Sequence, residues 1–122
     1  MSTWDREIFS ADENADFLDE LAQLEPEEVL EAVNDAVLLA ADGASASDEE
    51  TLNGRAAATI AAIWSGAPFS AGEIADTYPF IRSNPGEIGE QLSESAAAVL
   101  EAAQADGAEA ADGIDQFLEA LA

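Results

Sequence analysis

A chain of 122 residues has the length of one ordinary domain, and its formal net charge of −24 at pH 7 comes from 27 aspartates and glutamates against three arginines. Histidine, cysteine and lysine are absent, which excludes the commonest acid–base group, thiolate nucleophiles, disulfides and Schiff-base chemistry. Three arginines cannot neutralise a phosphate backbone, so we expect that neither nucleic acid nor an anionic membrane is a partner.

The first predicted helix begins after Ser10, which has the spacing of a capping box with Glu13. An N-terminal aromatic arm, residues 1–9, precedes this helix. Trp4 and Phe9 stand in the arm where their rings can fold over the apolar face of the helix, so we interpret them as lids of the core. That apolar face consists of Phe17, Leu18, Leu21 and Leu24.

Two further helices are predicted in the middle of the chain. Pro26 stands at the first position of one of them, where its missing N–H costs nothing. The segment 52–64 carries no charge after Arg55, so we expect it to form the central, most buried helix. Gly43 and Gly66 follow these segments, as expected of residues that end a helix in a left-handed conformation.

The last third of the chain predicts a short helix around Tyr78 that Pro79 ends or kinks. A long amphipathic helix follows, with Asn84 as its cap and Pro85 at its first position. Residues 108–122 are expected to hold a final, loosely attached helix. Together these elements predict an all-α fold, a single compact bundle of about five to six helices in one domain, residues 1–122.

Carboxylates are the candidate ligands of the first helix. Asp12, Asp16 and Glu20 recur at every fourth residue and share one face, an arrangement able to hold Ca²⁺ or Mg²⁺ weakly. No calcium-binding loop accompanies them, and such spacings arise by chance in so acidic a chain. We therefore predict no metal site and no cofactor. Paired carboxylates also serve glycosidases, but the aromatic residues are spread along the chain and predict no sugar cleft, so we expect no enzyme.

The N-terminal arm has a second interpretation as a protein-docking patch. An aromatic centre with a charged rim is typical of protein interfaces. The residues of this candidate patch are Trp4, Phe9, Asp12, Asp16 and Phe17.

The segment 4–17 resembles the start of an uncharacterised bacterial family, domain of unknown function 4259. That family opens with a Trp-Gly-x-Gly-x-Phe arm, followed by Asn-Asp and by an Asp-aromatic pair, and the matching residues here are Trp4, Phe9, Asp12, Asp16 and Phe17. Asp5 and Glu7 replace the glycines of the family, and Ala11 replaces its asparagine. The alanine-rich segment 56–66 is similar to a second block of the family, so the likeness covers the first half to two-thirds of the chain. The resemblance implies a small helical domain without an established activity, cofactor or catalytic residue.

The acidity favours two functional hypotheses of different classes. The first is a non-catalytic protein-interaction domain for a basic partner, in its sharpest form an inhibitor or immunity-type neutraliser of a basic enzyme. The second is a structural or housekeeping domain whose charge serves only solubility, with weak divalent-cation binding as a third alternative. No apolar run approaches the roughly 20 residues of a bilayer crossing, so we expect a cytoplasmic protein that spans no membrane. An apolar helix face would allow a homodimer as well as a monomer.

Overall fold

The computed structural model describes residues 8–9, 12–42, 48–65, 78, 90–105 and 114–121. Within these ranges the helices are α2 (Asp12–Ala22), α3 (Pro26–Asp42), α4 (Asp48–Trp64), α6 (Glu90–Ala105) and α7 (Ile114–Leu121). The same ranges contain no strand, and the predicted all-α fold is confirmed. None of the helices in them combines the length and the apolar character that a membrane span requires.

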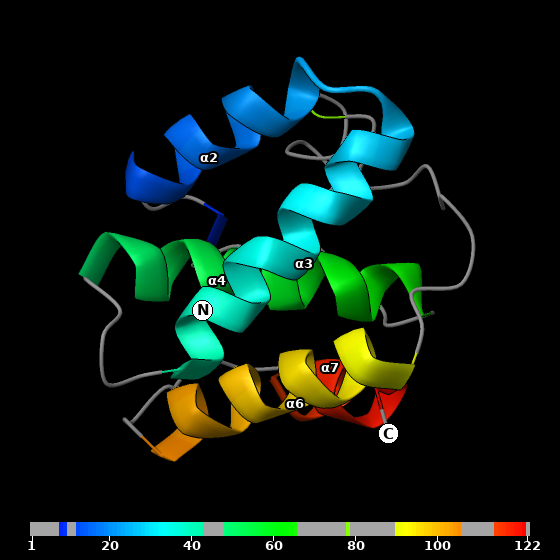
Figure 1. Cartoon of the computed structure of the whole chain (residues 1–122). Coiled ribbons are helices and arrows are strands. Elements are labelled where there is room, and N and C mark those ends of the chain that lie inside the picture. Colours follow the sequence, from blue (N-terminus) through cyan, green and yellow to red (C-terminus); the bar gives the residue numbers. More distant parts are fainter. Residues whose placement is uncertain are drawn as a thin grey trace.

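Helix α4 lies at the centre of the molecule and contacts each of the other four helices. Figure 1 shows α3 crossing in front of α4, with α2 on one side of this pair and α6 and α7 on the other. The closest association is between α3 and α4, and α6 also packs on both of them. The hydrophobic core therefore surrounds α4.

The composition of α4 explains its central position. Its residues 56–58 and 60–62 are completely buried, and five of these six are alanines. Alanine has no bulk beyond Cβ, so neighbouring helices approach α4 closely from several directions. Thr59 is also completely buried, and its hydroxyl donates a 2.8 Å hydrogen bond to the carbonyl oxygen of Arg55 within the helix. The expectation that the segment 52–64 forms the most buried helix is confirmed.

Helix α3 begins at Pro26, as the sequence predicts. The carbonyl oxygen of Glu25 accepts a 2.9 Å hydrogen bond from the amide of Val29, which closes the first turn. Glu27 and Glu28 lie in that turn, where carboxylates are stabilised by the positive end of the helix dipole. The apolar face of α3 follows the predicted spacing, because Val29, Val33 and Val37 are buried.

Several predicted helix boundaries lie outside the described residues. They are the caps Ser10 and Asn84, the glycines Gly43 and Gly66, and Pro79. Of the predicted C-terminal helix, α7 is described, and its Phe117 and Leu121 are buried in the core. Helix α7 contacts α4 and α6, which places the last described turn of the chain against the centre of the molecule.

Candidate functional site

The residues of the predicted docking patch differ in their solvent exposure. Phe9 is 3% exposed and belongs to the hydrophobic core, and Phe17 is half-buried against it. Asp12 and Asp16 are exposed on α2, and Trp4 lies outside the described residues. Of the patch residues that the structure describes, only these two aspartates are therefore exposed.

Asn14 holds the end of the N-terminal arm against α2. Its side chain is completely buried, and Nδ2 donates a 2.7 Å hydrogen bond to the carbonyl oxygen of Ile8. Ile8 and Phe9 enter the core next to this bond. Among the described residues the Oδ1 atom of Asn14 has no hydrogen-bond partner, so its bond to Ile8 is the one that the structure shows for this buried amide. We assign this bond a structural role.

The three carboxylates of α2 that the sequence offers as metal ligands lie on the surface. Asp12, Asp16 and Glu20 are all exposed. Across the described ranges, no group of three or more aspartates or glutamates has an arrangement that would hold a metal ion. Asp19, on the same helix, has a different role. Its Oδ1 atom accepts a 2.7 Å hydrogen bond from the Tyr78 hydroxyl.

This tyrosine–aspartate pair changes the acidity of the phenol. The hydrogen bond to Asp19 raises the pKa of Tyr78 above its ordinary 10.0 because it stabilises the neutral hydroxyl. Partial burial and the negative charges of Asp19 and Asp16 raise this pKa further. The tyrosine is therefore protonated at neutral pH and serves as a hydrogen-bond donor that attaches position 78 to α2.

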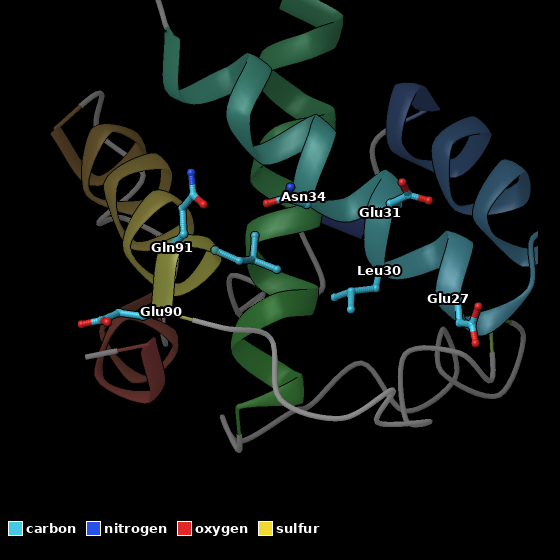
Figure 2. A pocket seen from close by; sticks show the side chains of 7 residues that line it. Glu27, Leu30, Glu31, Asn34, Glu90 and Gln91 are labelled. Carbon is cyan, nitrogen blue, oxygen red and sulfur yellow. The ribbon is translucent and has the colours of Figure 1, made fainter.

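A concave site lies between α3 and α6. It has a volume of about 420 Å³, which is within the range of ligand-binding pockets. We call it the α3–α6 hollow. The described residues that line it are Glu27, Leu30, Glu31, Asn34, Glu90, Gln91 and Leu92. Figure 2 shows Leu30 and Asn34 projecting from α3 into the space between the two helices, with Gln91 on the opposite side.

The lining of the hollow combines an apolar floor with an acidic rim. Leu92 is buried and Leu30 is half-buried, so these two side chains provide the floor. Glu27, Glu31 and Glu90 are exposed. Figure 2 places the first two carboxylates on the α3 side and Glu90 on the α6 side. The polar groups of the described lining residues are the carboxylates of these three glutamates and the amides of Asn34 and Gln91.

Sequence reasoning did not identify this hollow. Glu27 and Glu31 are four residues apart and therefore share one face of a helix. This spacing could have indicated from the sequence that two carboxylates of the lining lie together. Glu90 and Leu92 come from a segment about 60 positions later, and the sequence contains no indication that α6 packs beside α3. The pairing of the two helices creates the site.

The described acidic residues away from the hollow also lie on the surface of the molecule. Every acidic residue whose side-chain burial the structure describes is exposed, apart from Glu50, which is half-buried. Three large apolar side chains are exposed in the same ranges, namely Leu24, Leu38 and Leu39, and Leu39 is 51% exposed. Two of these are adjacent near the end of α3, on the helix that also carries two glutamates of the hollow.

Comparison with known proteins identifies one family. The family model described as Domain of unknown function (DUF4259) matches residues 2–119, so the likeness extends well beyond the first two-thirds of the chain. Neither a curated protein nor a solved structure matches the chain.

Proposed function

The chain belongs to the DUF4259 family, whose description assigns no function, and from this premise we propose that it is a non-catalytic protein-interaction domain for a basic partner. In its sharpest form, the domain is an inhibitor or immunity-type neutraliser of a basic enzyme, acting in the cytoplasm. The observation that carries the proposal is the location of the charge, because the acidic side chains whose burial is described are exposed, with the exception of Glu50.

Helix α3 is the clearest example of this charge distribution. Glu27, Glu31 and Asp35 recur at every fourth residue along it and are all exposed. Such a row gives a strong negative potential that attracts a cationic surface and accelerates its capture, and salt weakens this attraction. The exposed Leu38 and Leu39 at the end of the same helix supply the apolar contacts that interfaces add to charge.

We also propose that the domain has no catalytic activity. The chain has no histidine, cysteine or lysine, which leaves carboxylates as the principal candidates for a catalytic acid or base. In the described part of the molecule the carboxylates are spread over the surface, whereas a carboxylate that acts as acid or base is usually desolvated in a cleft.

The main alternative is a structural domain whose charge only maintains solubility. Both hypotheses predict retention of basic proteins at low salt, since any polyanion adsorbs them. The two hypotheses predict a different stoichiometry and a different selectivity for this binding. A specific partner requires contacts that an unstructured polyanion lacks, so its binding should survive salt concentrations that release adsorbed proteins.

The test is affinity capture from a lysate of the source organism, with stepped salt elution. A column carrying polyglutamate at the same charge density is the control, because it retains whatever binds to negative charge alone. The proposal predicts one basic protein that the control column releases earlier. Titration calorimetry of that protein, once purified, should give a defined stoichiometry and an affinity that falls with salt.

Identical elution from the two columns would assign the acidity to solubility and favour the structural alternative. A purified partner whose affinity does not change with salt would also contradict the proposal, because the surface carboxylates would then contribute nothing to binding.

A further inference from the structure

We propose that the α3–α6 hollow is the docking site for an arginine-bearing segment of the basic partner. This inference rests on the proposed function and adds to it the location and the chemistry of the contact. The hollow is large enough for an arginine side chain together with part of the neighbouring chain.

The floor of the hollow suits the aliphatic part of arginine. Leu30 and Leu92 come from two different helices and form the apolar part of the described lining. A long cationic side chain places its methylene groups on such a surface and keeps its charged end near water. A compact metal ion or a short polar group would leave these two leucines without a contact.

The polar part of the lining suits the guanidinium group. Figure 2 shows the amides of Asn34 and Gln91 on opposite sides of the space between the two helices, and Glu27, Glu31 and Glu90 are exposed residues of the lining. A guanidinium group has five N–H donors in one plane, so it can bond an amide oxygen and a carboxylate at the same time. The rim glutamates are exposed, so their pairing with a cation needs little desolvation.

The residues around the hollow provide a matched control for charge. The variant E27Q/E31Q/E90Q removes three carboxylates of the hollow. The variant E28Q/E94Q/E101Q removes three exposed carboxylates from the same two helices, at positions that are not among the described lining residues. Each variant changes the net charge by three, from −24 to −21. A difference in binding affinity between the two variants therefore depends on the position of the charges and not on the total charge.

The probe is a blocked peptide, acetyl-Gly-Arg-Gly-Arg-Gly-amide, titrated into the full ¹⁵N-labelled chain at low salt. Its counterpart contains citrulline, which has nearly the same shape without the charge. The inference predicts chemical-shift changes around Leu30, Asn34, Gln91 and Leu92. It predicts binding about five- to tenfold weaker for E27Q/E31Q/E90Q and less than twofold weaker for the control variant, since exposed ion pairs contribute modestly one by one.

The floor is tested separately with L30A, which leaves the charge unchanged. Binding of the arginine peptide should weaken about two- to threefold, because part of the apolar contact is lost. The amide spectrum of each variant shows whether it is folded. Equal binding by both triple variants, equal binding of the citrulline peptide, or shift changes confined to other helices would overturn the inference.

The two proposals fail in different ways. If a captured partner binds both triple variants equally, the domain recognises a basic protein elsewhere on its surface and only the inference about the hollow is wrong. If the peptide binds in the hollow as expected but both columns release the same proteins, arginine recognition stands and the proposed function is wrong.

Discussion

Gly54 of α4 lies directly against Ala40 of α3, so close that a Cβ atom at position 54 would overlap the Cβ atom of Ala40. The same added atom would lie 2.9 Å from the carbonyl oxygen of Ala36, another residue of α3. Real Cβ atoms do not approach other atoms this closely, and here both neighbours are held by helix backbone. The two central helices therefore meet at a distance that only glycine permits.

The first prediction concerns this contact. Gly54→Ala should lower the free energy of unfolding by about 1–3 kcal/mol, because overpacking outweighs the gain of about 1 kcal/mol that alanine brings to a helix. Urea unfolding followed by circular dichroism measures the change. The double variant G54A/A40G should be more stable than the sum of the single effects predicts, since it removes one of the two overlaps. A G54A variant as stable as the parent chain would refute the close approach.

The second prediction concerns the titration of Tyr78. The chain contains one tyrosine, so the change in absorbance near 295 nm with pH follows this residue alone. The midpoint should lie above 10, because the hydrogen bond to Asp19 favours the neutral phenol. In D19A the midpoint should return toward 10, and D16N should lower it less. A midpoint at or below 10 in the parent chain would show that the bond to Asp19 is not formed in solution.

The third prediction is the effect of the same pair on stability. The pKa of Tyr78 is raised on folding, so the folded chain holds this proton more tightly than the unfolded chain does. This contribution to stability is fully present below pH 10 and is lost as the pH rises from there through the folded pKa. Between pH 9 and pH 11, the free energy of unfolding should therefore fall more steeply in the parent chain than in Y78F. Equal slopes would contradict the linkage.

The fourth prediction concerns Asn14. In N14A the buried carbonyl oxygen of Ile8 loses the donor seen at 2.7 Å, so the free energy of unfolding should fall by about 1–3 kcal/mol. N14D has almost the same shape but places a carboxylate in the same buried position, and it should be less stable than N14A at pH 7. Protonation of the new carboxyl restores a donor, so the deficit of N14D relative to the parent chain should shrink near pH 4. Urea unfolding at both pH values measures these differences.

The fifth prediction concerns the charge as a whole. The exposed carboxylates repel one another, with Glu27 and Glu31 on the same face of α3 as one example. Raising sodium chloride from 20 to 500 mM should therefore increase the melting temperature, by about 4 °C for each kcal/mol of repulsion relieved. The variant E28Q/E94Q/E101Q should respond less, because it contains fewer charges. A melting temperature that falls with salt would mean that attractive ion pairs dominate.

The amino-acid sequence by itself determined the helical class, the identity of the central helix and the sign of the surface. The spacing of Val29, Val33 and Val37 defines one apolar face, and the lack of charge after Arg55 shows that α4 is buried on most of its sides. These are local properties, because a helix repeats every 3.6 residues whatever it packs against.

Only the tertiary structure decided which residues meet. Tyr78 bonds to Asp19 across 59 positions of the chain, and the glutamates of the α3–α6 hollow come from two helices far apart in sequence. Helical periodicity shows which face of a helix is apolar, but it does not show which other helix covers that face. Which helices pack together depends on how closely they can approach, and small residues such as Gly54 and Ala40 set that distance. The resulting arrangement of the helices created the candidate site.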